Sequence, residues 1–192
     1  MNSYRLAPMS RDLLIVTLVL LALPVVFIGI AVTGRSILVG PGLLLVIIYA
    51  WVWLRFRPTL FVVHPRELEV VWPLKRRRLS RDGVTEVRLI DKAELRQRVG
   101  FGMRVGAGGL WGGFGWLWSA RRGIVQMYIS RTDDFVWIEF SDERPWLITP
   151  EQPTLFVRAL SKGPSVGARQ EKAMNSKITL RGGENGDRTA DI

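Results

Sequence analysis

Two adjacent runs of apolar residues, neither containing a charge, constrain the fold of this chain more than any other feature. The first run has twenty-two residues between Asp12 and Arg35, and the second has nineteen residues between Arg35 and Arg55. At a rise of about 1.5 Å per residue, either run is long enough as a helix to cross a hydrocarbon core of roughly 30 Å. The link between the runs is short, so the helices must be antiparallel neighbours. We therefore predict a hairpin of two transmembrane helices, at about residues 13–33 and 37–54.

A buried core helix and a secretory signal peptide are the alternatives to a membrane span. A signal peptide has an apolar stretch of about 7–15 residues that ends at a small-x-small cleavage site. The first run is longer, has no Ala-x-Ala sequence, and leads directly into the second run. These features favour the membrane hairpin.

The charges on the two sides of the hairpin predict its orientation. The connecting segment carries one basic residue, Arg35, whereas Arg5 and Arg11 precede the hairpin and several more basic residues follow it. Positive charge close to the ends of membrane helices is enriched on the cytoplasmic side. We therefore expect both termini to be cytoplasmic, with residues 1–12 forming a cytoplasmic arm.

The region that follows the hairpin reads as a series of short β-strands separated by turn sequences. Seven stretches fit this description: 59–63, 68–74, 76–79, 84–90, 124–130, 135–140 and 146–149. The segment Arg131–Asp134, between the fifth and sixth stretches, is typical of a hairpin turn. Six or seven short strands closed by a helix predict a small orthogonal barrel or sandwich.

Two short helices are expected in the same region. The first, residues 92–99, places Glu94 and Arg98 four residues apart on one face. The second begins with Thr149 as the N-cap and Pro150 in the first helical position. Three apolar residues of this second helix share one face: Leu155, Phe156 and Leu160.

The end of the chain, residues 161–192, is rich in glycine, serine, asparagine and charge, and it contains no aromatic residue. This composition predicts a disordered tail. The domain organisation is therefore the cytoplasmic arm, the two membrane helices within residues 13–54, a cytoplasmic β-domain at 55–160, and the tail.

Several segments, in a fixed order, resemble the bacterial pleckstrin-homology (PH-like) domain proteins, in which a membrane hairpin often precedes the β-domain. They are LFVVHPRELEVVW, LSRDGVTEVRLI, GAGGLWGGFG, MYISRTDDFVWIEF and WLITPEQPTLFVRAL, and together they span roughly residues 58–160. The resemblance implies a mainly β fold, with two partly orthogonal antiparallel sheets capped by a C-terminal helix. It does not imply inositol-lipid recognition, because the first hairpin, VVHPRELE, lacks the basic residues that phosphoinositide-binding PH domains carry there.

Residues 100–118 contain eight glycines and three tryptophans, and this segment invites comparison with a nucleotide-binding loop. Gly106–Gly112 is close to G-x-G-x-x-G but off by one residue, no helix is expected after it, and no Walker-A lysine is present. The structural interpretation is a bent, bulged chain in which glycine permits positive φ. Its aromatic residues either pack internally or contact the bilayer or a partner. These residues are Trp111, Phe114, Trp116 and Trp118.

The densest basic run consists of Lys75, Arg76, Arg77 and Arg78. A basic residue near an anionic leaflet contributes about 1 kcal/mol, so the run is a candidate contact for anionic headgroups. The alternative is a solvated turn. Nucleic-acid binding would require interleaved aromatic residues on one face, and Trp72 is the only close one, so no nucleic-acid partner is expected.

The sequence offers no constellation for catalysis. It has no cysteine and a single histidine, His64, and the apolar runs contain no ionisable residue. We therefore expect no catalytic residue, no cofactor and no metal site. The leading hypothesis is a non-enzymatic, membrane-anchored interaction module that binds a protein partner or an anionic lipid surface. The alternatives are an accessory subunit of a larger membrane complex and a membrane enzyme that uses the glycine-rich segment.

Overall fold

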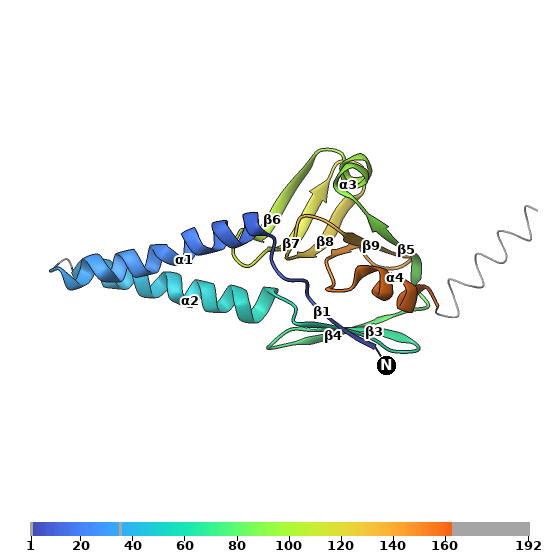
Figure 1. Ribbon diagram of the computed structural model, residues 1–192, viewed down its shortest axis with the longest axis horizontal. Helices are drawn as coiled ribbons and strands as arrows, with labels where there is room; N and C mark the ends of the chain where they lie inside the picture. The colour runs from blue at the N-terminus through green and yellow to red at the C-terminus, as the bar shows by residue number, and fades with distance from the viewer. Residues whose placement is uncertain (1, 35, 163–192) are drawn as a thin grey trace, which may run out of the picture.

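The computed structural model describes residues 2–34 and 36–162. Two helices, α1 (Arg11–Val32) and α2 (Val39–Phe56), lie side by side and project from a β-domain (Figure 1). A short 3₁₀ turn, η1 (Ser36–Leu38), leads into α2. The predicted tail lies, from residue 163 onward, outside the described residues.

Both helices leave most of their apolar side chains exposed. Only 11% of the most apolar stretch of α1, and 6% of that of α2, is buried within the protein. A core helix of a globular domain would bury these side chains, and these helices do not. Both helices are long and apolar enough to cross a membrane. They are held together by packing and by the hydroxyl of Tyr49, which donates to the carbonyl of Leu20 at 2.9 Å.

The β-domain consists of two sheets. The first contains β1 (Asn2–Arg5), β2 (Leu60–Val63), β3 (Glu67–Val71) and β4 (Arg76–Ser80) in chain order. The second has the order β5-β9-β10-β8-β7-β6. Its strands are β5 (Val84–Ile90), β6 (Gly102–Gly108), β7 (Gly113–Ser119), β8 (Gly123–Ile129), β9 (Phe135–Phe140) and β10 (Trp146–Ile148). Helix α3 (Lys92–Val99) follows β5, and helix α4 (Pro153–Ser161) follows β10.

Apolar side chains fill both sides of the second sheet. One cluster includes Phe61 from the first sheet, Trp146 from the second, and Phe156 from α4. A separate cluster, which includes Trp137 and Leu117, is joined by Leu95 of α3. The predicted fold class is therefore confirmed: two apolar helices precede a two-sheet, mainly β domain that ends in a helix.

The N-terminal arm is part of the β-domain, which the sequence analysis did not foresee. Strand β1 pairs antiparallel with β2, with Tyr4 opposite Phe61. The arm then crosses to the second sheet, where the N–H of Ala7 donates to the carbonyl of Thr149 at 2.9 Å. The hydroxyl of Ser130 donates to the carbonyl of Ala7 at 2.6 Å. The chain therefore enters α1 from a fixed position on the domain.

The order of strands in the second sheet corrects one expectation. Strands β8 and β9 were predicted to form a hairpin across Arg131–Asp134, but β10 lies between them. Strand β10 pairs antiparallel with β9 and parallel with β8, so this sheet is mixed rather than wholly antiparallel. The reason is burial: Trp146, Leu147 and Ile148 are all essentially inaccessible, and a wholly apolar strand is most stable in the interior of a sheet.

The glycine-rich segment forms two further strands, β6 and β7, which raises the number of strands from Leu60 to Ile148 to nine. Gly106 and Gly115 face each other in this hairpin, with φ angles of 137° and 131°. Side chains at these positions would overlap backbone atoms of the partner strand. The interpretation of the glycines as a backbone requirement agrees with this geometry.

Helix α3 occupies the predicted residues, with the Asp91 carboxylate accepting from the N–H of Glu94 as an N-cap. The start of α4 was predicted wrongly. Its first residue is Pro153, not Pro150, because Thr149 is buried and its hydroxyl accepts from the N–H of Ser130. Leu155 is consequently half exposed, while Phe156 and Leu160 pack into the core.

Candidate functional site where the β-domain meets the apolar helices

The turn between β6 and β7, Gly109–Gly112, is bound to the two apolar helices, and we call it the helix-contacting turn. The buried hydroxyl of Thr17 in α1 accepts from the N–H of Trp111 at 3.0 Å. The same hydroxyl lies 2.9 Å from the carbonyl of Gly109 and 2.7 Å from that of Leu13. In Figure 1 the turn accordingly lies beside the first turns of α1.

Trp111 joins this turn to α2. Its ring contacts Trp53 edge to face at 4.8 Å between centroids, and Tyr49 at 6.4 Å. Its backbone has a φ of 60°, an uncommon conformation for a non-glycine residue that costs about 1–3 kcal/mol. Contacts with both helices stabilise this conformation, so the orientation of the domain relative to the helices is fixed at Trp111.

An exposed apolar surface, which we call the apolar face, covers part of β6, β7 and β8. It surrounds a shallow cavity of about 360 Å³ and consists of Met103, Val105, Trp116, Trp118 and Ile124. Trp116 and Trp118 are 46% and 47% exposed, whereas Phe114, on the same strand, is buried in the core. Four aromatic residues of the glycine-rich segment were candidate contacts. Trp116 and Trp118 are exposed, Phe114 is buried, and Trp111 packs against the helices.

The basic run Lys75–Arg78 is not a uniform patch of free charge. Arg77 forms an ion pair with Glu143 at 2.7 Å. Arg78 lies 3.8 Å from Glu67, and Arg76 lies 3.8 Å from the largely buried Glu69. Strand pairing between β3 and β4 creates the last two pairs, because it places the acidic residues of one strand beside the basic residues of the other.

Lys75 differs from the other three because, among the described residues, no carboxylate pairs with it. Its ammonium group lies 4.5 Å from the ring centre of Trp72, whose indole N–H donates to the carbonyl of Phe56 at the end of α2. Burial, and then the positive charges of Arg55 and Arg77, lower the pKa of Lys75. Lys75 and Arg55 are therefore close enough to repel each other.

Arg57 adds a third positive charge at the same end of α2. Its guanidinium group lies 4.2 Å above the ring of Trp53, and its Nε is buried with no hydrogen-bond partner in the described part of the chain. Burial lowers the pKa of Arg57. We call Arg55, Arg57 and Lys75 the basic corner: three cations that lack a carboxylate partner among the described residues, located where α2 meets the β-domain.

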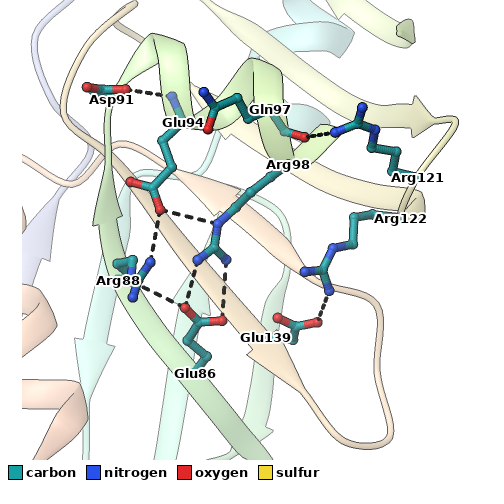
Figure 2. A network of polar contacts seen from close by, with 9 residues as sticks. All are labelled: Glu86, Arg88, Asp91, Glu94, Gln97, Arg98, Arg121, Arg122 and Glu139. Carbon is teal, nitrogen blue, oxygen red and sulfur yellow. Dashed lines mark hydrogen bonds and ion pairs between the residues drawn. The ribbon is translucent and has the colours of Figure 1, made fainter. Parts of the chain in front are cut away.

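A second polar cluster, on the far side of the second sheet, has a structural role. Figure 2 shows Arg98 of α3 between two carboxylates, at 2.9 Å from Glu86 and 3.3 Å from Glu94. The hydrogen bond between Arg98 and Glu86 lowers the pKa of Glu86 and raises the pKa of Arg98. The same guanidinium group lies 6.0 Å from the ring centre of Trp137. These contacts hold α3 on the sheet, and every charge in them has a partner.

The arrangement contains no recognisable catalytic geometry within residues 2–34 and 36–162. His64 lies 3.2 Å from Glu69, and no group of three or more potential metal-binding side chains occurs in that part of the chain. The distinctive features of the site are instead a fixed attachment to apolar helices, an exposed apolar face and the basic corner.

The two-sheet β-domain closed by a C-terminal helix defines a PH-like domain. Residues 60–163 match the family described as Bacterial PH domain, and the chain therefore belongs to this family. No significant match was found among curated proteins or among solved structures.

Several residues of this site were missed by the sequence analysis, and Thr17 and Arg55 show why. Thr17 is a polar residue within an apolar run, where a hydroxyl needs a partner, and that isolation was the available signal. Arg55 served only to mark the end of the second apolar run. Its proximity to Lys75 depends on the turn between β3 and β4 returning to the end of α2, which no local pattern encodes.

Proposed function

We propose that this protein is a non-enzymatic, membrane-anchored module whose PH-like domain is held against the anionic lipids of the cytoplasmic leaflet. The observation that carries the proposal is the basic corner. Arg55 marks the end of the second apolar run, which places it near the headgroups if α2 crosses the membrane. An anionic headgroup beside Arg55 and Lys75 would relieve their mutual repulsion. A non-catalytic role is in keeping with the PH-like family.

Two observations support a topology with both termini in the cytoplasm. Basic residues flank the hairpin on the side of the domain, as the positive-inside rule requires. In addition, β1 precedes α1 yet pairs with β2, which follows α2. One sheet lies on one side of a membrane, so an even number of crossings must separate these strands.

The lipid proposal predicts a selective effect of two substitutions. Replacing both Arg55 and Lys75 with glutamine in the full chain should weaken its preference for phosphatidylglycerol over phosphatidylcholine by up to about thirtyfold, since each basic residue near an anionic surface contributes about 1 kcal/mol. Spin-labelled lipids of the two kinds, mixed into nanodiscs with the protein, measure this preference through the fraction that is motionally restricted.

The matched control is the double variant Arg76→Gln and Arg78→Gln. It removes the same number of positive charges, but from residues paired with Glu67 and Glu69, so the lipid preference should change by less than about threefold, as expected for compensated surface charges. An equal loss in the two double variants would indicate a general charge effect and would contradict a specific role for the basic corner.

A protein partner is the second candidate function, and the apolar face is the observation that favours it. Soluble surfaces rarely present two half-exposed tryptophans beside further apolar side chains without a binding role. The partner could be a larger membrane complex to which this chain is an accessory subunit. Co-purification from native membranes should then recover a protein that is lost when Trp116 and Trp118 are both replaced by serine. Recovery of the same proteins with the unaltered chain and with the double variant would exclude the apolar face as the binding surface.

A further inference from the structure

We propose that the helix-contacting turn does not lie above the bilayer but enters the cytoplasmic leaflet as a re-entrant wedge between the headgroups and the start of the acyl chains. The inference rests on the membrane anchoring proposed above, and it concerns a different part of the molecule from the basic corner. It assigns a lipid environment to backbone that belongs to the β-domain.

The length of α1 places the turn within the membrane. A side chain at Gly109 would lie 3.0 Å from Val16 and 3.5 Å from Leu20, which fixes the level that the turn reaches along α1. From Leu20 to the end of α1 at Val32 the helix rises only about 18 Å, and even from Val16 it rises about 24 Å, at 1.5 Å per residue. A hydrocarbon core is about 30 Å thick. The length of the apolar helix therefore matches the thickness of the hydrocarbon core only if the residues beside the turn are also within the membrane.

The second helix leads to the same result. Tyr49 and Trp53 of α2 contact Trp111. From Val39, the first residue of α2, to Tyr49 the helix rises about 15 Å, which is half the thickness of a hydrocarbon core. Arg55, the first charge after the run, lies six residues beyond Tyr49, or about 9 Å further toward the cytoplasm. The ring of Trp111 thus lies deeper in the membrane than Arg55.

Backbone polar groups of the turn have protein partners. Irregular backbone is tolerated at membrane depth only where protein groups satisfy its hydrogen bonds. The hydroxyl of Thr17 accepts from the N–H of Trp111 at 3.0 Å, and its single proton lies within reach of two carbonyls, that of Gly109 at 2.9 Å and that of Leu13 at 2.7 Å. The N–H of Gly109 donates to the carbonyl of Gly112 at 2.9 Å. A turn in contact with water would not need a buried threonine from an apolar helix for this purpose.

The distribution of charge along the β6–β7 hairpin is compatible with a shallow insertion. Residues 105–120 contain no charged side chain, and Arg104 and Arg121 bound this stretch. The four residues from Val105 to Gly108 span about 13 Å at 3.3 Å per residue, which sets the greatest depth that the hairpin could reach before Arg104 meets the headgroups. Because β6 is an edge strand with unpaired backbone groups, the insertion is shallower than this limit.

The absence of cysteine from the sequence allows a direct test with single-cysteine variants of the full chain. Gly108→Cys reports on the turn, since Gly108 is exposed and a side chain there meets open space. Val25→Cys reports on the middle of α1, and Lys92→Cys reports on the aqueous side of the domain. Labelling by a membrane-impermeant maleimide is measured in inside-out membrane vesicles, in which the cytoplasmic surface faces the reagent.

The expected result is rapid labelling of Lys92→Cys and labelling at least about tenfold slower for both Gly108→Cys and Val25→Cys, because a thiolate forms poorly in apolar surroundings. Slow labelling at position 25 with fast labelling at position 108 would overturn the wedge alone. Fast labelling at position 25 would overturn the anchoring itself. Labelling at position 92 only in right-side-out vesicles would overturn the topology, and with it the assignment to the cytoplasmic leaflet.

A second measurement separates lipid from protein cover over the turn. A bimane fluorophore attached to the reconstituted Gly108→Cys variant should be quenched more strongly by a lipid with a nitroxide near its glycerol end than by one with the nitroxide near the end of its chain. The order should be reversed for a bimane attached to the Val25→Cys variant. Slow labelling at position 108 without quenching by either lipid would mean that another copy of the protein covers the turn, and would overturn the proposal.

Discussion

Replacing Arg81 with methionine is expected to lower the free energy of unfolding by about 3 kcal/mol, a typical value when buried carbonyl groups lose a charged donor. Arg81 is 6% exposed, and its guanidinium group donates to the carbonyl of His64 at 2.7 Å. It also donates to the carbonyls of Ala159 and Leu160, at 2.9 and 2.8 Å, in the last turn of α4. Methionine would fill much of the space but would leave these acceptors without Arg81 and remove a cation from a helix C-terminus.

Urea titration of the full chain in mild detergent, followed by the near-ultraviolet circular dichroism of its tryptophans, would measure this effect. Arg66→Met is the matched control, since the side chain of Arg66 is exposed, and it should change the unfolding free energy by less than about 0.5 kcal/mol. Arg81→Lys should recover part of the loss, because it keeps the charge but not the planar fork. Equal losses in the lysine and methionine variants would assign the whole effect to the guanidinium geometry, and no loss in either would refute the role proposed for Arg81.

Gly106→Ala is expected to destabilise the second sheet by about 3 kcal/mol, through backbone strain and overlap combined. Gly106 has a φ of 137°, a conformation that alanine adopts only with strain. A methyl group there would overlap the carbonyl oxygen of Phe114 and would approach the Cα of Gly115 to 2.9 Å. Both obstacles are backbone atoms of β7, so they are unable to move without disturbing the strand pairing.

The control lies two residues away in the same strand. Gly108→Ala adds the same methyl group in open space and should change stability by less than about 0.5 kcal/mol. The same urea titration compares the two variants. Similar stabilities would show that the glycines of β6 are not required by the backbone, and would reopen the question of a ligand at this segment.

Strands and helices whose pattern is contained in a few consecutive residues were predictable from the sequence. The strands at 84–90 and 135–140 and the helix at 92–99 have the predicted bounds. The strand at 84–90 alternates apolar and polar residues, the strand at 135–140 is a short apolar run between turn sequences, and the helix at 92–99 has Asp91 as its N-cap. The start of α4 was misplaced because Thr149 has the sequence of an N-cap but bonds across the sheet to Ser130 instead.

The pairing order of the strands was not predictable, because it depends on segments far apart in the chain. Strand β10 is three residues long; its wholly apolar sequence favours the interior of a sheet, but nothing in it specifies β8 and β9 as its neighbours. The pairing of β1 with β2 joins residues on opposite sides of two apolar helices. Local sequence patterns therefore predict only a short polar arm before α1 and not a strand of the first sheet.

The residue types of the candidate site were visible in the sequence, but their exposure was not. Phe114, Trp116 and Trp118 alternate along β7 and so belong to one face of the second sheet. Phe114 lies within the core cluster shared with the first sheet, whereas the two tryptophans lie outside it. The neutralisation of Arg76 and Arg78 likewise depends on the register of β3 against β4.

The position of β1 has a consequence for how the protein is made. The arm leaves the ribosome before either helix, but its partner strand, Leu60–Val63, emerges only after both helices have been synthesised. If the two helices span a membrane as proposed, the first sheet is completed only in chains whose arm and domain lie on the same side. A chain with the arm on the other side would lack the edge-to-face contact of Tyr4 with Phe156 and would expose the core beneath α4. On the proposed topology, the pairing of β1 with β2 therefore distinguishes correctly inserted chains from misinserted ones.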